Sequence, residues 1–288
     1  MKTNDSKSLN MLIVSVCIFG TVGIFRRYIP LSSGLIALVR GVLGAAFLLI
    51  TGVIRRKRPN FLSIRKNLPM LLLSGAAICF NWILLFEAYN HTTVAIATLC
   101  YYLAPVFVIL ASPVILGTKL TIRKIICAVF ALGGMVLISG ILETGNDASM
   151  DYTGILYGIG AAVLYACVML ANQKITDIAA EDRTVVQLCA AAVALLPYVL
   201  LTQPVSGIVL TQTTVLLLLI TGVVHTGLAY RMYLGSMEKL EAHTIALFSY
   251  MDPVLAIVLS AVFLKEPFTV TAAIGAVMIL GAAWFGER

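Results

Sequence analysis

Long runs of hydrophobic residues alternate with short polar or turn-forming segments along the whole chain. A helix rises about 1.5 Å per residue, so a run of about twenty residues can cross a hydrocarbon core of about 30 Å. The pattern therefore predicts an all-α integral membrane protein with ten transmembrane helices. We expect these helices at residues 9–29, 33–54, 68–89, 93–116, 121–142, 153–173, 184–203, 213–234, 242–264 and 268–286.

A polar stretch at residues 143–151 is the clearest break in this pattern. It separates a first unit at residues 1–145 from a second unit at residues 150–288, and each unit contains five of the predicted helices. The other connections are short, so we expect no separate soluble domain to carry chemistry of its own.

The second unit repeats part of the first. A shift of 148 residues aligns residues 98–106 with residues 246–254, and the alignment continues without a gap into the last helix of each unit. Each unit has an odd number of spans, so the two copies are predicted to cross the membrane in opposite directions. Inverted repeats are typical of secondary transporters, whose substrate site lies near the midplane between the repeats. Identical pairs include Tyr102 and Tyr250, Pro105 and Pro253, and Gly133 and Gly281.

Composition and charge agree with a membrane protein. Hydrophobic residues make up 60% of the 288 residues and charged residues only 11%, which is not typical of a soluble domain. We interpret the net charge of +7 as topological charge, and expect no binding of nucleic acid. With the N-terminus inside, sixteen Lys and Arg residues fall on the cytoplasmic side and Arg40 lies within a helix. The positive-inside rule therefore predicts a multi-pass protein of the cytoplasmic membrane with both termini in the cytoplasm. Three basic residues fall on the outer side: Arg26, Arg27 and Lys265.

No motif for a metal, a cofactor or ATP is present. The six cysteines all lie within hydrophobic runs, and neither a CxxC motif nor a Cys/His cluster occurs. A GxxxxGK[ST] phosphate-binding loop is also absent from the sequence. We therefore expect no cofactor and no metal site, and a transporter that does not hydrolyse ATP.

Residues 95–134 and 242–281 resemble the EamA-type, ten-helix branch of the drug/metabolite transporter superfamily. Both segments contain a proline within a predicted helix, a short polar turn and a glycine-rich following helix. The acidic residue that usually follows the proline helix is present in residues 265–267 and missing from residues 117–119. Residues 19–20 are Phe-Gly, where many members of the family have Trp-Gly. The resemblance implies transport without naming the cargo.

Helix nine contains the strongest candidate for a site residue. Asp252 lies about ten residues into the predicted span, and a carboxylate at that depth is costly unless it is hydrated, paired or protonated. It could bind a cationic group of the substrate, carry a proton, or form a structural pair. Pro105 and Pro253 each free a backbone carbonyl near mid-span, so we predict hinges there, the alternative being a packing kink.

Three further ionisable residues lie within predicted helices. Arg40 could neutralise a carboxylate of the substrate or pair with Glu87. Glu87 lies near the outer end of its helix and is a candidate for proton coupling. His225 lies at mid-span, where it could relay protons or be a structural residue with satisfied hydrogen bonds.

Aromatic residues are the remaining candidates for the substrate site. Tyr102 and Tyr250 each lie three residues before a repeat-related proline, so each lies one turn away on the same helix face. We expect both to face a midplane cavity, with Gln173 as a further hydrogen-bonding partner. The other predicted members of this site are Tyr101, Tyr165, Trp82 and Asn81.

These observations predict a secondary transporter that exports amino acids or related amphipathic metabolites by alternating access, with proton coupling. An alternative is transport of organic cations or amines, which aromatic walls and carboxylates bind through cation–π contacts. A channel or a lipid-modifying membrane enzyme is disfavoured, because the sequence has no selectivity loop and no HExxH motif. The expected partners are a small-molecule substrate and the lipid bilayer, and the protein is expected to be a monomer or a homodimer.

Overall fold

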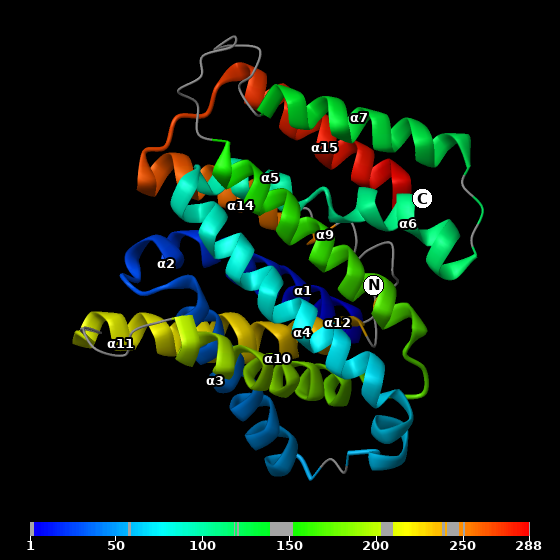
Figure 1. Ribbon diagram of the computed structural model, residues 1–288, viewed down its shortest axis with the longest axis vertical. Coiled ribbons are helices and arrows are strands. Elements are labelled where there is room, and N and C mark those ends of the chain that lie inside the picture. Colours follow the sequence, from blue (N-terminus) through cyan, green and yellow to red (C-terminus); the bar gives the residue numbers. More distant parts are fainter. Residues whose placement is uncertain are drawn as a thin grey trace.

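The computed structural model describes residues 3–56, 59–117, 119, 121–138, 152–202, 210–237, 240, 248–249 and 251–287. The regular secondary structure of this part of the chain is entirely helical, and it contains no strand (Figure 1). The first half contains α1 (Thr3–Gly20), α2 (Val22–Tyr28), α3 (Ser33–Ile54), α4 (Phe61–His91), α5 (Val94–Tyr101), α6 (Ala104–Leu116) and α7 (Ile122–Ile138). The second half contains α9 (Thr153–Lys174), α10 (Ala180–Thr202), α11 (Gln212–Leu219), the π-helix η1 (Ile220–Leu228), α12 (Ala229–Met237), α14 (Met251–Leu259), the π-helix η2 (Ser260–Leu264) and α15 (Val270–Glu287).

In the part of the chain that the structure describes, seven helices are long and apolar enough to cross a membrane, and this confirms a multi-pass membrane protein. Three shorter apolar helices, at residues 125–137, 251–264 and 270–282, lie in positions where the sequence predicts further spans. The full count of ten stays a prediction. The seven long helices span residues 6–28, 33–54, 61–91, 94–116, 153–174, 180–202 and 212–236.

The predicted fourth span is divided in two. The sequence pattern predicts one helix over residues 93–116, but α5 ends at Tyr101 and α6 begins at Ala104. Pro105 is the second residue of α6, where its missing N–H costs no helical hydrogen bond. Pro253 is the third residue of α14, but residues 248–249 before it are also helical and residue 250 lies outside the described residues. Pro105 therefore begins a helical segment instead of bending a continuous one, and the hinge at Pro253 stays a prediction.

The two repeat-related segments also end alike. Gly117 follows α6 and Lys265 follows η2, and they are 148 residues apart. Both residues have the left-handed backbone conformation, with φ of 68° and 54°. Glycine adopts this conformation readily, and lysine adopts it at a cost.

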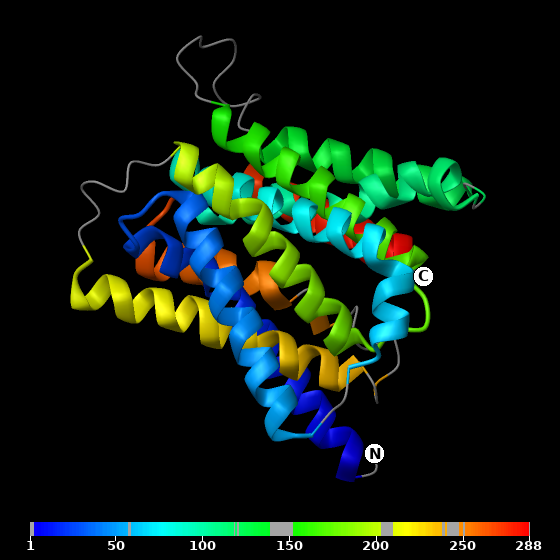
Figure 2. The same ribbon diagram turned by 60° about the horizontal axis from the view of Figure 1, so that its bottom comes forward.

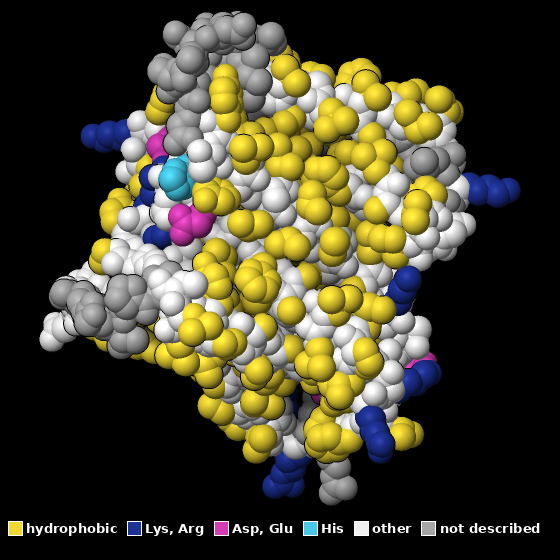
Figure 3. All heavy atoms as spheres, viewed as in Figure 1, with side chains coloured by type: hydrophobic (Ala, Val, Ile, Leu, Met, Phe, Trp, Pro, Cys, Tyr) yellow, Lys and Arg dark blue, Asp and Glu magenta, His cyan; other side chains and the backbone are white. Residues whose placement is uncertain are grey.

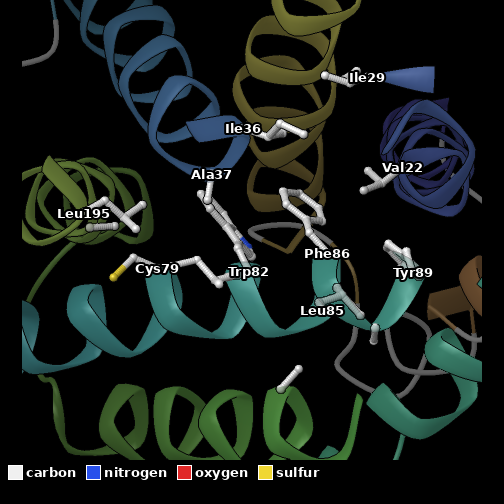
Figure 4. Close-up of a cluster of buried hydrophobic side chains, with 14 of the residues drawn as sticks. Val22, Ile29, Ile36, Ala37, Cys79, Trp82, Leu85, Phe86, Tyr89 and Leu195 are labelled. Carbon is white, nitrogen blue, oxygen red and sulfur yellow. The ribbon is translucent and has the colours of Figure 1, made fainter. Parts of the chain in front are cut away.

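The core forms where α4 packs against its neighbours. One face of α4 carries Trp82, Leu85, Phe86 and Tyr89, and all four are buried. Figure 4 shows this face turned toward α3 and α2, with Leu195 of α10 at the side. The face shown in Figure 3 is also apolar: hydrophobic side chains cover the middle of the view, and Lys and Arg project at its edges. Such a surface suits contact with lipid tails.

Glycines allow some of these helices to approach closely. A Cβ atom at Gly75 of α4 would lie 2.6 Å from the backbone oxygen of Gln187 in α10. A Cβ atom at Gly134 of α7 would lie 2.7 Å from the backbone oxygen of Gly275 in α15. Helices α7 and α15 accordingly lie side by side in both ribbon views (Figures 1 and 2).

Candidate functional site

A cavity of about 190 Å³ lies between helices from both halves of the chain. We call it the central cavity. Its walls come from α1, α2, α3, α4 and α5 of the first half and from α9, α12 and α14 of the second. It is lined by Val16, Phe19, Val22, Arg40, Trp82, Leu85, Tyr89, Thr98, Tyr101, Tyr102, Tyr165, Tyr230, Tyr233, Ser249 and Asp252.

Asp252 supplies the only carboxylate among these lining residues. The hydroxyl of Tyr102 lies 3.0 Å from Oδ2 of Asp252 and 3.2 Å from the backbone oxygen of Ser249. Tyr102 follows the last residue of α5, so the turn between α5 and α6 places its ring beside α14. In the part of the chain that the structure describes, no cation lies within ion-pair distance of Asp252. The carboxylate is therefore held by a neutral donor and faces the central cavity.

Arg40 is a buried cation, with only 5% of its surface exposed. Its Nε donates a hydrogen bond to the hydroxyl of Thr226 at 2.7 Å. The guanidinium carbon lies 4.3 Å from the centre of the Trp82 ring, which is within cation–π range. Among the described residues, the two terminal nitrogens have no hydrogen-bond partner and no carboxylate lies within ion-pair distance.

Aromatic rings make up much of the remaining wall. Tyr101 of α5 stacks on Tyr165 of α9, with ring centres 5.1 Å apart. On the other side, Tyr230 and Tyr233 of α12 pack with their edges toward Phe19 of α1, at 5.4 and 6.0 Å. The cavity thus combines one carboxylate, one guanidinium and a tyrosine-rich surface.

The structure brings together most of the predicted site residues. Asp252, Tyr101, Tyr102, Tyr165, Trp82 and Arg40 all line the central cavity. Tyr250 lies outside the described residues. Asn81 is buried beside the cavity but does not line it, because its side-chain nitrogen donates to the backbone oxygen of Ala161 at 2.5 Å. Gln173 is exposed near the end of α9.

Two of the three candidates for proton coupling lie away from the cavity. Glu87 accepts a hydrogen bond from Asn90 at 3.1 Å, and its side chain is 30% exposed. It forms no ion pair with Arg40, which removes the pairing that the sequence left open. His225 lies 2.8 Å from the hydroxyl of Thr21 and packs its ring against Phe25. Its polar contacts are internal, and it is not among the lining residues.

Sequence reasoning missed Tyr89 and Tyr233 as cavity residues and Thr226 as the partner of Arg40. Tyr89 follows Trp82 by seven residues, or about two helical turns, so helical periodicity would have placed both on one face. Tyr233 follows Tyr230 by three residues in the same way. No signal in the sequence pairs Thr226 with Arg40, because they are 186 residues apart.

An ion pair joins several elements at one end of the bundle. Nη2 of Arg27 lies 2.7 Å from Oε1 of Glu266 and 2.8 Å from the backbone oxygen of Thr92. The other oxygen of Glu266 accepts hydrogen bonds from the backbone nitrogen of Val94 and from the hydroxyl of Ser260. We call Arg27, Thr92, Val94 and Glu266 the Arg27 cluster.

The Arg27 cluster lies just beyond the central cavity. Arg27, Thr92 and Val94 are three to five residues along the chain from the lining residues Val22, Tyr89 and Thr98. At about 1.5 Å per helical residue, this places the cluster roughly one turn past the cavity wall. The cluster connects α2, the start of α5 and the segment after η2.

No group of three or more His, Cys, Asp or Glu side chains in the described part of the chain is placed to hold a metal ion. The site is therefore defined by its charged and aromatic side chains. A bundle of apolar helices around a small cavity with charged groups at its wall is typical of a membrane transporter.

Comparison with known proteins identifies the family. The chain belongs to the EamA-like transporter family, whose model matches it twice, at residues 7–140 and 152–285. The relatives also indicate a transporter and not an enzyme. The uncharacterized transporter YxxF of Bacillus subtilis is 28% identical over 262 residues, which is 90% of this chain and 82% of that protein.

Two further matches extend over nearly the whole length. An uncharacterized transporter of Archaeoglobus fulgidus is 26% identical over 284 residues, covering 96% of this chain and 95% of that protein. Protein PecM of Dickeya dadantii is 24% identical and covers 92% and 87%. A solved crystal structure with 19% sequence identity matches with a TM-score of 0.67 over 97% of this chain and 96% of that chain, and it shows the fold alone.

Proposed function

We propose that this protein is a secondary transporter that exports small zwitterionic metabolites of the amino-acid type across the cytoplasmic membrane. The observation that carries the proposal is the presence of Asp252 and Arg40 in one cavity without an ion pair between them. A zwitterion offers an ammonium group to the first and a carboxylate to the second. The tyrosines between them suit the apolar part of an amphipathic molecule.

Energetics support a ligand with two charges. An ionised group within the membrane costs several kcal/mol unless it is paired or hydrated. The central cavity holds one group of each sign, and a ligand that pairs with both offsets the cost of each at once. The volume of about 190 Å³ favours a small metabolite over a lipid or a peptide.

Organic cations are the second candidate. Asp252 beside Tyr102, together with the stacked Tyr101 and Tyr165, provides a carboxylate and aromatic faces for an amine. Arg40 disfavours a purely cationic substrate, because its positive charge would repel the substrate at short range.

For the energy source we propose proton coupling through Asp252. Among the described residues it is the one carboxylate that lines the cavity, so a proton and a substrate ammonium would compete for the same oxygen atoms. Flux in proteoliposomes should then accelerate with an opposing proton gradient. A flux that does not change with the proton gradient would contradict proton coupling and would leave the proposed substrate class unaffected.

The ligand class can be tested on the purified protein by thermal stabilisation. The screen would contain amino acids, polyamines, nucleobases and quaternary amines. A ligand at one hundred times its Kd stabilises the native state by about 2.7 kcal/mol. We expect amino acids to raise the melting temperature, and stabilisation by quaternary amines alone would favour the second candidate instead.

The mechanism that we propose is alternating access by two inverted five-helix units with ten spans in total. The twofold match of the family model, the repeat-related prolines and the matching left-handed residues Gly117 and Lys265 support this arrangement. The distribution of Lys and Arg favours both termini in the cytoplasm, which puts the Arg27 cluster on the outer side.

Under this mechanism the Arg27 cluster closes the outer end, and Glu266→Gln should loosen it. A partly exposed ion pair contributes about 1 kcal/mol, so we expect outward opening to increase about fivefold. The measurement is labelling of Val22→Cys by an impermeant maleimide from outside, in a background without the six native cysteines. Val22 lines the cavity one turn below Arg27.

Two controls accompany this measurement. Exchanging the charges in Arg27→Glu with Glu266→Arg should slow the labelling again, though not fully, since Val94 and Ser260 lose their acceptor. Asp177→Asn breaks an exposed ion pair with Lys66 and should leave labelling unchanged. Equal labelling of Glu266→Gln and the parent would show that the cluster does not close the cavity.

A further inference from the structure

The segment that partners Arg40 is a π-helix. In η1 the hydroxyl of Thr226 donates to the backbone oxygen of Thr221 at 3.1 Å, five residues earlier. Nδ1 of His225 lies 3.3 Å from the backbone oxygen of Ile220, again five residues earlier. π-Helices are rare and frequently occur at functional sites.

The hydrogen bonding of Thr226 has a fixed direction. A hydroxyl has one proton to donate, and in Thr226 that proton goes to the backbone oxygen of Thr221. The remaining lone pairs can only accept, and Nε of Arg40 donates to one of them at 2.7 Å. The π-helical backbone therefore turns Thr226 into an acceptor that points at Arg40.

Close packing of η1 against α3 fixes the position of this acceptor. A Cβ atom at Gly44, one turn after Arg40 on α3, would lie 2.5 Å from Cγ2 of Thr226. A Cβ atom at Gly222 would lie 2.5 Å from Cβ of Leu43. Glycine at these two positions brings the helices into direct contact beside Arg40.

The guanidinium is thereby held on two sides. Thr226 holds its Nε edge, and the ring of Trp82 lies 4.3 Å away as a cation–π partner. The edge that remains carries the two terminal nitrogens. These nitrogens have no hydrogen-bond partner among the described residues, although Arg40 is only 5% exposed. Two parallel N–H groups on one edge match the two oxygens of a carboxylate.

We infer that Thr226 is a positioning residue, which orients Arg40 so that the transporter selects substrates with a free carboxylate. This inference rests on the proposed function and deepens it. Amino acids should bind better than their carboxamides, because an amide has one acceptor oxygen instead of two, carries no negative charge, and turns an NH2 donor toward the guanidinium. A charge-assisted bidentate pair corresponds to a preference of roughly tenfold to hundredfold.

The test compares Kd values for the twenty free L-amino acids and their carboxamides, measured by ligand stabilisation of the purified full-length protein. Thr226→Val keeps the shape of the side chain and removes the acceptor. We expect it to reduce the preference for the free acid to about threefold or less, with amide binding unchanged. Thr226→Ser retains the acceptor and should restore the preference. Arg40→Gln should abolish it and so sets the lower limit.

Thr21→Val is the matched control. The Thr21 hydroxyl bonds to His225, the neighbouring side chain of the same π-helix, and has no contact with Arg40 among its described hydrogen bonds. This variant should lower stability without changing the preference for the free acid. An equal loss of preference in Thr21→Val and Thr226→Val would overturn the inference, because it would show a general effect of loosening η1.

The other outcomes are also decisive. A folded Thr226→Val protein with the parental preference would overturn the positioning role. A parent protein that binds acids and amides equally would overturn the inference and leave the transporter proposal standing. If the parent binds amines and no amino acid, the proposed substrate class itself fails.

Discussion

Asp252→Asn should abolish high-affinity substrate binding and leave the fold intact. Asparagine has nearly the same shape and can still accept the hydrogen bond from Tyr102. It cannot neutralise an ammonium group, and losing one member of a buried charge pair costs about 2 kcal/mol or more. We therefore expect at least a thirtyfold rise in Kd, roughly, measured by ligand stabilisation.

The unliganded variant should be as stable as the parent protein or more stable. Removing a carboxylate that has no cationic partner in the described structure also removes the cost of burying its charge. A fall in melting temperature without ligand would instead indicate a structural role for Asp252.

Glu87→Gln supplies the matched control for this prediction. It makes the same chemical change in a side chain that is 30% exposed and lies outside the cavity. Its Kd should stay within about twofold of the parent value, since exposed charges interact weakly. If both variants lose binding equally, the Kd depends on the net charge of the protein and not on a carboxylate in the central cavity.

Gly75→Val should prevent stable packing of α4 on α10. A Cβ atom at this position would lie 2.6 Å from the backbone oxygen of Gln187 and 2.6 Å from Cβ of Ala190, so the two backbones must separate. Separation would also break the hydrogen bond from the side-chain nitrogen of Gln187 to the hydroxyl of Ser74 in α4, which is 2.7 Å long. Overpacking alone costs about 3 kcal/mol, and we expect a large fall in melting temperature and in monodisperse yield.

Gly52→Val is the control for this change. Gly52 lies in α3, and a Cβ atom there would have no heavy atom within 4 Å. Valine is a better helix former than glycine, so stability should be unchanged or slightly higher. Similar losses in the two variants would mean that helix spacing at Gly75 does not limit stability.

The sequence predicts helices well here because membrane spans depend on a local property, a run of apolar residues long enough to cross lipid. It fails where a local run hides a change in backbone geometry. The turn after Tyr101 lies inside such a run, and so does the π-helix η1. The start of α4 was also missed, since Arg65 and Lys66 interrupt the apolar pattern while the helix continues back to Phe61.

The site divides in a similar way. The internal repeat pointed to Tyr102 and to the segment around Asp252, and the structure places these two side chains 3.0 Å apart. The repeat could not place Arg40 beside Thr226 or Arg27 beside Glu266, since these pairs depend on the rotation of each helix about its axis. The apolar sequence leaves that rotation undetermined.

The π-helix has a consequence for relatives of this protein. When one residue is inserted into an α-helix and the flanking turns keep their positions, the backbone hydrogen bonds at the insertion span five residues instead of four, which makes a π-helical turn. A relative with one residue fewer between Ile220 and Leu228 would turn its threonine by about 100° away from α3. Arginine at the position of Arg40 should therefore be inherited together with the length of this helix, and an alignment gap in η1 should coincide with a different residue there.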